Sequence, residues 1–286
     1  MTRATIEVLP IDAADVVDVA RFLHAELNES VSAAAWMQLL QPPWGATGPN
    51  RGFQLRADGE LVGVYAAVYA ERMVEGAPVS ICNLAAFCVR AEHRMHGLKL
   101  VRALLKQRDQ AFTDFSPSGN VVAMNERLGF RRLDTSTRLV VNLPRWPRRD
   151  IRLSDSPARL QSVLQGTDAQ IYRDHRESGA ARHLLIERAD EYAYLVFRAD
   201  ARKGLRLFAA PLYVGGDPAV LGTAWNDVRA YLLRRHRLLF CLAEHRLLPA
   251  ARGLGRELRH PRPKMVRGDT PDAIDYLYSE LALVSW

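Results

Sequence analysis

The stretch VRAEHRMHGLKLVRALL at residues 89–105 decides how the first half of this chain folds. It follows the apolar run SICNLAAFC (80–88), which is typical of a buried strand, and its second part has the apolar spacing of an amphipathic helix. The corner between them lacks the Asp, Ser or Thr that usually accepts hydrogen bonds from the first N–H groups of a helix. Arg, His and Lys crowd this end instead, where they oppose the helix dipole. A bound anion is one way to stabilise such a corner.

Length and composition limit the class of protein. With 286 residues, 48% of them hydrophobic and 25% charged, the chain suits one large or two small soluble domains. Its cysteines, Cys82, Cys88 and Cys241, lack metal-ligand spacing, so we expect no disulfide framework, no metal and a reducing compartment. The first residues lack a signal-peptide pattern, and no apolar stretch is long enough to span a membrane, which favours a cytoplasmic protein.

The chain is basic, with a net charge of +7 and a pI of about 9.6. Such a charge fits a genome rich in arginine codons, a polyanionic ligand, an acidic carrier protein or nucleic acid. The basic run 234–239 lies at an expected helix end and has no interleaved aromatic residues, which argues against nucleic acid. The two histidines in 175–183 have no further ligands beside them, which argues against a metal.

Residues 1–146 are expected to form one unit in which strands and helices alternate. The expected elements are, in order, a strand at 4–10, a helix capped by Asp12, a helix at 32–41, a hairpin turning at Asp58-Gly59, a strand at 77–89, a helix at 97–108, a strand near 112–115, a helix opened by Ser118 and a hairpin-like pair at 130–144. The helix at 97–108 implies a parallel crossover between the strands on either side of it.

Residues 151–286 are expected to form a second unit, because the charged, proline-containing stretch 145–150 is typical of a linker. Its expected elements are paired strands at 192–199 and 204–214, a helix that begins at Asp217-Pro218, a strand at 237–245 and a final strand at 277–286. The two halves share a strand–helix–strand order, which is compatible with a diverged internal duplication.

Two motifs resemble those of the GNAT superfamily, the acyl-coenzyme A-dependent N-acyltransferases. The family's Arg/Gln-x-x-Gly-x-Gly/Ala loop appears as RMHGLK (94–99), and its closing motif appears as ERLGF (126–130). The element order across 1–143 is also similar. The resemblance implies a GNAT-like α/β (α+β) fold: a mixed, mostly antiparallel sheet, splayed between its fourth and fifth strands and flanked by helices. It further implies a degenerate GNAT-like unit in 151–286, because the helix start GGDP (215–218) lacks the cofactor motif.

The same resemblance implies a site for acetyl-CoA or a longer acyl-CoA at the corner. The pyrophosphate would lie on the N–H groups of Met95 to Lys99, where Gly97 lets the backbone approach closely. Lys99 departs from the family, which has Gly or Ala in that position. The residues expected to contact coenzyme A are Val89, Arg94, Met95, His96, Gly97, Leu98, Lys99, Ser118 and Asn120.

The catalytic residues stay open at this level. Asn125 occupies the position where many GNAT relatives carry a tyrosine acid, and an amide has no labile proton near neutral pH. Candidates for the remaining chemistry are Glu71, Asn83 and Tyr278, with Glu75, His24, Asp114 and Glu280 as further ones. Glu280 and Tyr278 depend on the second unit supplying the end of the chain to the site.

Three functions are compatible with these features. The first is an acyl-CoA-dependent N-acyltransferase that acts on a small-molecule amine. The second is a relative that takes its acyl group from an acyl carrier protein, which would dock on the basic surface. The third is a non-catalytic GNAT-fold module that binds acyl-CoA, and missing acid and base residues would favour it.

Overall fold

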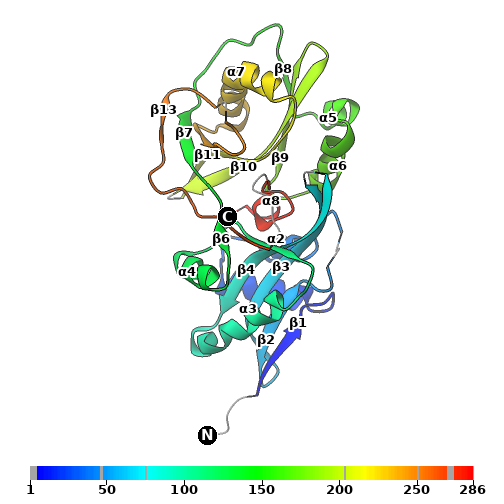
Figure 1. The fold of residues 1–286 in the computed structure, drawn as a ribbon, viewed down its shortest axis with the longest axis vertical. Helices are drawn as coiled ribbons and strands as arrows, with labels where there is room; N and C mark the ends of the chain where they lie inside the picture. Colours follow the sequence, from blue (N-terminus) through cyan, green and yellow to red (C-terminus); the bar gives the residue numbers. More distant parts are fainter. Residues whose placement is uncertain are drawn as a thin grey trace. The chain divides into compact units, whose positions relative to one another are not determined.

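The protein consists of two mixed α/β units, each built on a seven-stranded, mostly antiparallel sheet flanked by helices (Figure 1). This architecture confirms the predicted fold class. The structure is a computed structural model, and it describes residues 5–45, 48–74, 76–202, 204–249, 251–268 and 274–285. The first unit comprises Met1–Leu133, Pro263–Ile274 and Tyr278–Val284, and the second comprises Asp134–Arg262, Asp275–Leu277 and Ser285–Trp286.

The first unit contains most of the elements expected in the first half of the chain. They are, in order, β1 (Ile6–Pro10), α1 (Val16–Glu26), α2 (Ala33–Leu40), β2 (Gly52–Ala57), β3 (Glu60–Val74), β4 (Ala77–Val89), the 3-10 helix η1 (Ala91–His96), α3 (Gly97–Leu105), β5 (Ala111–Asp114), α4 (Gly119–Arg127) and β6 (Arg131–Arg132), with β14 (Met265–Arg267) and α8 (Glu280–Leu283) from the end of the chain. The strand order is β1-β2-β3-β4-β5-β14-β6.

The sheet of the first unit opens between β4 and β5, as predicted. These strands are parallel, and β5 pairs only with Ile81, Cys82 and Asn83 of β4. Beyond Asn83 the register of β4 against β3 shifts between Ala66 and Ala67. Such a bulge bends a strand and increases its twist. The distal part of β4 therefore turns away from β5 and leaves an opening in the sheet.

The central strands of this sheet are buried on both faces. One face packs against α3 through a cluster that includes Leu100, Val101 and Leu104, together with Tyr65 and Cys82. The helices α1 and α2 contact β3, and α1 also contacts β4. Burial on both faces explains why β3 and β4 have nearly continuous apolar sequences instead of an alternating pattern.

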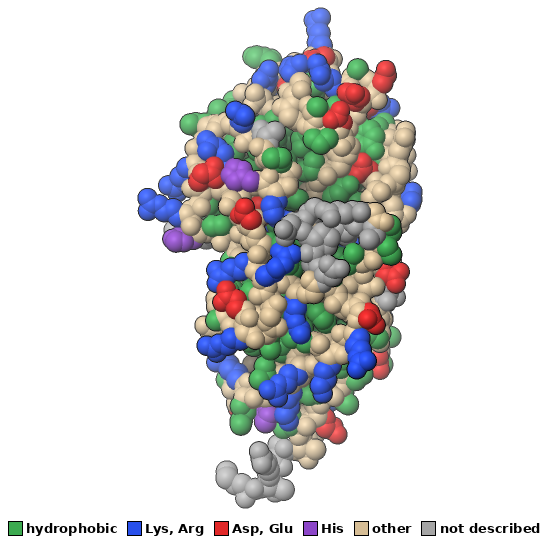
Figure 2. Space-filling view, viewed as in Figure 1, with side chains coloured by type: hydrophobic (Ala, Val, Ile, Leu, Met, Phe, Trp, Pro, Cys, Tyr) green, Lys and Arg blue, Asp and Glu red, His purple; other side chains and the backbone are tan. Residues whose placement is uncertain are grey.

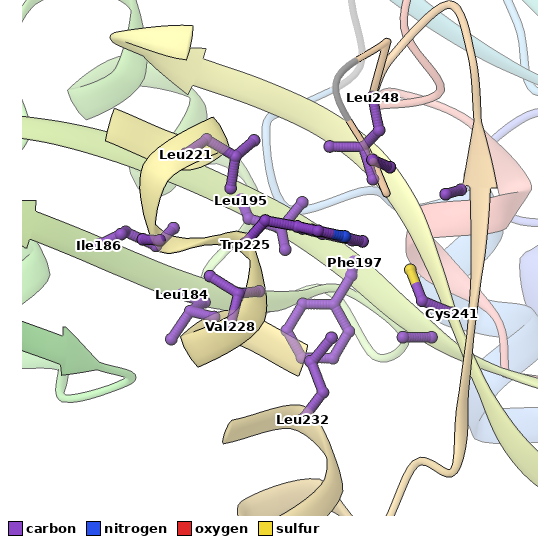
Figure 3. Packing of buried hydrophobic residues seen from close by; sticks show 14 of the residues in the cluster. Leu184, Ile186, Leu195, Phe197, Leu221, Trp225, Val228, Leu232, Cys241 and Leu248 are labelled. Carbon is purple, nitrogen blue, oxygen red and sulfur yellow. The ribbon is translucent and has the colours of Figure 1, made fainter. Parts of the chain in front are cut away.

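The second unit repeats this architecture. Its elements are β7 (Thr137–Val141), β8 (Arg152–Ser154), α5 (Pro157–Val163), α6 (Gly166–His175), β9 (Arg182–Arg188), β10 (Glu191–Arg202), β11 (Leu205–Gly216), α7 (Pro218–His236), β12 (Phe240–Glu244) and β13 (Gly255–Glu257). From β8 to β12 the order of strands and helices, and the parallel pairing of the last two strands, are those of β1 to β5. Asp217 caps α7 by accepting a hydrogen bond from the Ala219 N–H at 2.7 Å, as its sequence predicts. Trp225 of α7 lies in the apolar core against the sheet (Figure 3).

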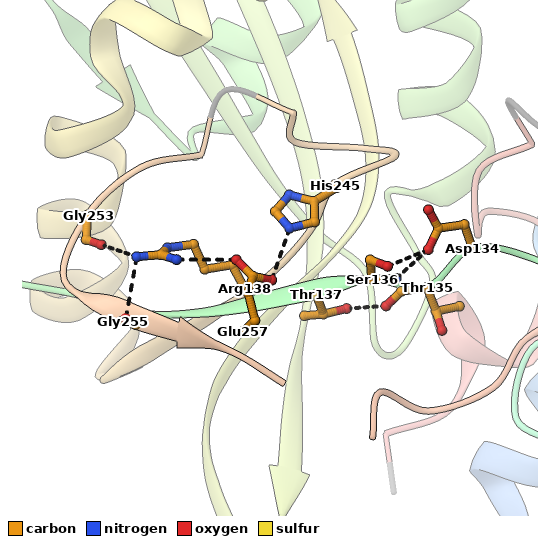
Figure 4. Close-up of polar contacts among 9 residues, drawn as sticks. All are labelled: Asp134, Thr135, Ser136, Thr137, Arg138, His245, Gly253, Gly255 and Glu257. Atoms are coloured by element: carbon orange, nitrogen blue, oxygen red, sulfur yellow. Dashed lines mark hydrogen bonds and ion pairs between the residues drawn. The ribbon is translucent and has the colours of Figure 1, made fainter. Parts of the chain in front are cut away.

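Each sheet contains one strand from the other half of the chain. β14 lies between β5 and β6 in the first sheet, and β7 lies between β12 and β13 in the second. Arg138 of β7 donates hydrogen bonds to Glu257 at 3.2 Å and to the carbonyls of Gly253 and Gly255 at 3.2 and 3.3 Å (Figure 4). The predicted hairpin at 130–144 is therefore wrong, because its two strands belong to different sheets. The first segment of the first unit accordingly ends at Leu133, before the predicted linker.

Three further expectations need correction. Residues 280–283 form α8 instead of a strand, since Ser279 caps a helical turn by accepting the Leu281 N–H at 3.2 Å. The helix expected at 97–108 ends at Leu105. Asp12 does not cap α1, because its carboxylate accepts the Ala14 N–H in the preceding turn. Glu75 lies outside the described residues.

Candidate functional site

The opening between β4 and β5 begins at a buried pair of polar side chains. Asn83 and Thr113, the last residues paired between these strands, are both 0% exposed. The Asn83 amide donates to the Thr113 hydroxyl at 3.1 Å and accepts the backbone N–H of Glu280 at 3.2 Å. Asn83 thus joins β4, β5 and the start of α8. An amide is not basic, so the candidate Asn83 positions its neighbours and does not take up a proton.

A carboxyl group stands at the end of β5, one residue beyond this pair. Asp114 is 4% exposed, and its Oδ2 accepts a hydrogen bond from the buried Asn125 amide of α4 at 2.8 Å. Burial raises the pKa of Asp114 to about 7, against the hydrogen bonds from Asn125 and the Ser116 N–H, which lower it. A carboxyl group that titrates near neutral pH can both accept and donate a proton.

A second buried carboxyl group comes from α8. Glu280 is 0% exposed, and its Oε1 accepts a hydrogen bond from the Ser116 hydroxyl at 2.7 Å. Tyr278 lies two residues earlier, with its ring centre 5.0 Å from that of Trp44 and 4.8 Å from the Arg72 guanidinium. Both residues were expected from the second half of the sequence, and both belong to the first unit.

Tyr65 of β3 is a residue of this site that the sequence did not reveal. It is 2% exposed, and its ring centre lies 4.7 Å from that of Phe87. Burial raises the pKa of the Tyr65 hydroxyl, and Asp114, Cys82 and Glu280 raise it further, which places each of these groups near Tyr65. Its hydroxyl has no hydrogen-bond partner among the residues that the structure describes. Tyr65 lies in an apolar run typical of a buried strand, which hid its polar atom.

The corner before α3 is built differently from the expectation. No side chain caps α3, as predicted, but the 3-10 helix η1 leads directly into it. Within η1 the N–H groups of His93 and Gly97 donate to the carbonyls of Arg90 and Arg94. These two N–H groups already have backbone acceptors. The missing cap is therefore replaced in part by 3-10 hydrogen bonds.

Gly97 is closely packed at this corner. A Cβ atom at Gly97 would lie 3.0 Å from the Phe87 ring and 3.5 Å from Val89, whereas one at Gly119 of α4 would meet nothing within 4 Å. We expect Gly97→Ala to be destabilised relative to Gly119→Ala by about 1 kcal/mol or more, as is usual for overpacked sites. Urea unfolding of the two variants measures this difference. Equal stabilities would show that the approach of α3 to β4 tolerates a methyl group.

Exposed cations cover the outer side of η1 and α3. Figure 2 shows Lys and Arg side chains gathered over the first unit. Those exposed on η1, α3 and the following loop are Arg94, Lys99, Arg102, Lys106 and Arg108. Arg94 and Lys99 form no ion pair within the described residues. Met95, Leu98, Ser118 and Asn120 are exposed as well, and Ser118 at the start of α4 makes no side-chain capping bond.

The other candidate residues lie away from the opening or are bound elsewhere. Glu71 is exposed and lies opposite Ser80 in the register of β3 and β4, toward the hairpin end of these strands. His24 of α1 lies 2.8 Å from the Val31 carbonyl through its Nδ1. Burial raises the pKa of Cys82 to about 12 and that of Cys88 to about 11, so neither thiol is a nucleophile at neutral pH.

The corresponding opening of the second unit is filled. β11 and β12 pair only at Phe208–Phe240 and Ala209–Cys241. Beside these strands, the Tyr276 N–H donates to the Leu212 carbonyl of β11 at 3.0 Å, and its hydroxyl bonds to Glu244 at the end of β12. Tyr276 is 0% exposed. The end of the chain thus lies at both openings: Tyr276 bonds to the strands of the second, and the Glu280 N–H bonds to Asn83 at the first.

Two negative findings apply to the described part of the chain only. No group of three or more His, Cys, Asp or Glu side chains lies close enough together to hold a metal ion. None of the helices there has the length and apolar character needed to cross a membrane.

The sequence matches no known protein-family profile and no curated protein. The structure does have counterparts. It is similar to a GCN5-related N-acetyltransferase from Anabaena variabilis ATCC 29413, with a TM-score of 0.59 and 11% identity over 92% of this chain and 72% of the other. The fold is that of the GCN5-related N-acetyltransferases. This confirms the GNAT resemblance at the level of the fold.

Two further solved structures extend the comparison. A probable N-acyltransferase from Enterococcus faecalis V583 gives a TM-score of 0.57 and 13% identity, with 97% of this chain and 73% of the other covered. Saccharomyces cerevisiae N-myristoyltransferase, solved with bound myristoyl-CoA, gives a TM-score of 0.51 and 12% identity, with 100% of this chain and 86% of the other covered. The last similarity spans both units of the chain.

Proposed function

We propose that the protein transfers an acyl group from acyl-coenzyme A to the amine of a small molecule. The observation that carries this proposal is the opening between β4 and β5 in a GNAT fold, with the buried carboxyl group of Asp114 at its start. A carboxyl group in that place can handle the proton that an attacking amine must lose. The solved structures of similar fold include N-acetyltransferases and a myristoyl-CoA complex, which supports the same class of reaction.

The residues of the first unit fit an acyl-CoA substrate. Arg94 of η1 and Lys99 of α3 are exposed cations on the two elements that follow β4, and they would bind the phosphates of acyl-CoA. The pantetheine arm would enter the opening along β4 toward Val89, with Ser118 and Asn120 at the start of α4. The His93 and Gly97 N–H groups already serve η1, so the phosphate contacts rest more on side chains than the sequence implied.

The reaction needs no metal or redox group. The amine nitrogen attacks the thioester carbonyl carbon, the C–N bond forms, the C–S bond breaks, and the products are an amide and the coenzyme A thiol. The chain must bind both substrates, orient them and move protons. Asn83 and Thr113 fix the edge of the opening, and Glu280 is anchored next to it by Ser116.

We assign the second unit to a diverged GNAT-like repeat without a site of its own. The matching order of β8–β12 and β1–β5 supports a duplication. Tyr276 fills the opening of the second sheet, and its bonds to Glu244 and Leu212 hold it there. We keep a two-domain organisation and place its boundary by the compact units, in which β14 joins the first unit and β7 the second.

Binding of acyl-CoA tests the proposal. We expect Arg94→Ala and Lys99→Ala each to weaken the binding of acetyl-CoA and longer acyl-CoAs by about 1–3 kcal/mol, the range for hydrogen bonds to charged groups. Isothermal titration calorimetry measures the loss. The matched control is Arg21→Ala on α1, because Arg21 is an exposed arginine whose one ion pair among the described residues is with Asp18 at 3.9 Å. Release of free thiol in the presence of a panel of amines then measures turnover.

Each result has a separate meaning. Equal binding of acyl-CoA by wild type, Arg94→Ala and Lys99→Ala would place the acyl-CoA site elsewhere. Tight acyl-CoA binding without turnover of any amine would favour a non-catalytic acyl-CoA-binding module. A protein that binds no free acyl-CoA but accepts an acyl group from an acyl carrier protein would favour the carrier as the donor.

A further inference from the structure

We propose that Asp114 carries the proton in the transfer reaction, with Asn125 as the residue that positions it. This inference rests on the proposed function and deepens it. Asp114 takes a proton from the ammonium form of the acceptor, and later gives that proton to the departing thiolate. The acceptor class that follows is an amine that is protonated in solution.

The location of Asp114 is the first observation. It follows Thr113, the last residue of β5 that pairs with β4, so its carboxyl group stands where the two strands part. Its other neighbour in the sheet is the fully buried Met265 of β14, which has no polar group to offer. A thioester lying in the opening would come next to this carboxyl group before any other on β4 or β5.

The way Asp114 is held is the second observation. The Asn125 amide donates to Oδ2 at 2.8 Å, and Asn125 is 0% exposed. The Ser116 N–H also donates to this carboxyl group. Two donors fix the orientation of the carboxyl group but neither can take its proton. An orienting amide next to a reactive carboxyl group has the geometry of a positioning residue.

The charges around Asp114 are the third observation. Tyr65 of β3 lies near Asp114, and Cys82 of β4 and Glu280 of α8 lie near Tyr65 in turn; none of these groups is a cation. No Lys or Arg side chain bonds to Asp114 within the described residues. A buried carboxylate without a cation favours binding of a positive group. An ammonium group of the acceptor would supply that charge.

Proton transfer at neutral pH is compatible with this environment. Burial raises the pKa of Asp114 to about 7, so its two forms are both populated at neutral pH. In the first step the carboxylate accepts one ammonium proton. The free amine then attacks the thioester carbonyl, and the C–N bond forms. As the C–S bond breaks, the carboxylic acid protonates the thiolate, and the second proton lost by nitrogen goes to solvent.

The test compares Asp114→Asn with Asp109→Asn, an exposed carboxylate on the loop before β5. We expect Asp114→Asn to bind acyl-CoA within about twofold of wild type and to lose a factor on the order of 10²–10⁴ in kcat, the usual share of general acid–base catalysis. The ascending limb of the pH–rate profile near pH 7 should disappear. Asn125→Ala should shift that limb to higher pH, because the lost hydrogen bond stabilises the carboxylate. Asp109→Asn should leave rate and profile unchanged.

Unfolding measurements give a readout that does not depend on turnover. The pKa of Asp114 is raised from 3.8 to about 7, so the folded protein keeps a proton that the unfolded chain has lost in this window. Stability conferred by that proton falls as pH rises from about 4 to 7. The wild type should therefore lose more stability than Asp114→Asn over this range. The same pH dependence in both proteins would contradict the titration of Asp114.

The outcomes separate the two proposals. A kcat and pH–rate profile in Asp114→Asn like those of wild type would overturn the proton role and leave the acyltransferase function standing. A wild-type profile without any ionisation between about pH 6 and 8 would overturn the role without the use of a variant. A wild type that neither binds acyl-CoA nor acylates any amine would overturn both proposals together.

Discussion

A chain truncated after residue 262 is expected to lose the folded state of the first unit. The truncation removes β14, which pairs with β5 and β6, and also removes α8. From the first unit it takes away six large non-aromatic apolar side chains that are at most 9% exposed, namely Met265, Val266, Ile274, Leu281, Leu283 and Val284. Burial of each contributes about 1.5–3 kcal/mol. Their sum is comparable with the roughly 5–15 kcal/mol that stabilises a whole domain.

Circular dichroism and limited proteolysis of the truncated chain check this expectation. A chain truncated after Val284 keeps every segment that the structure assigns to the first unit, and it serves as the control. Addition of a peptide that spans 263–284 should restore protection of the first unit from protease. A truncated chain as resistant as the control would mean that the first sheet is stable with β5 as its edge.

Trp225→Ala is expected to destabilise the second unit by about 3–5 kcal/mol, the range for replacing a buried Trp by Ala. Trp225 is 4% exposed and lies among Leu195, Phe197 and Val228 (Figure 3). Its indole N–H also donates to the Arg252 carbonyl at 2.8 Å, so the substitution leaves both a cavity and an unpaired acceptor.

Trp146→Ala is the matched control, because Trp146 belongs to the same unit and is 89% exposed. We expect its effect to stay within about 0.5 kcal/mol, as is usual for surface positions. Urea unfolding followed by far-ultraviolet circular dichroism measures both variants without relying on the lost fluorophore. Similar losses in the two variants would contradict the packing of α7 against its sheet.

Local signals in the sequence predicted the elements that depend on neighbouring residues. Asp217 and Pro218 mark the start of α7, and the apolar run before Val89 predicts β4. The exchange of β7 and β14 has no such signal, because strand pairing depends on residues far apart in the chain. The segment after Tyr278 is apolar throughout, and a short apolar run does not distinguish a strand from a buried helix.

The site was predictable to a similar extent. The position of Asn83 on the fourth strand was placed correctly, and Asp114 and Glu280 were among the candidates. Their roles depend on burial and on hydrogen bonds to partners such as Asn125 and Ser116. The sequence alone does not show which residues are buried or which of them bond to each other. The 3-10 hydrogen bonds of η1 likewise arise from backbone geometry, which the sequence does not show. Because these bonds use two of the N–H groups, the structure supports an anion-binding site before α3 less strongly than the missing cap in the sequence did.

The exchanged strands also determine when the first unit can be completed during synthesis. Asp114 pairs with Met265, and a ribosome that adds about 5–20 residues per second needs roughly 8–30 s to translate the intervening stretch. Throughout that interval the nascent chain presents β5 as an open edge, which is prone to pair with other chains. Nascent chains that stall before residue 265 would never acquire the site, and we expect them to be substrates for chaperones and proteases.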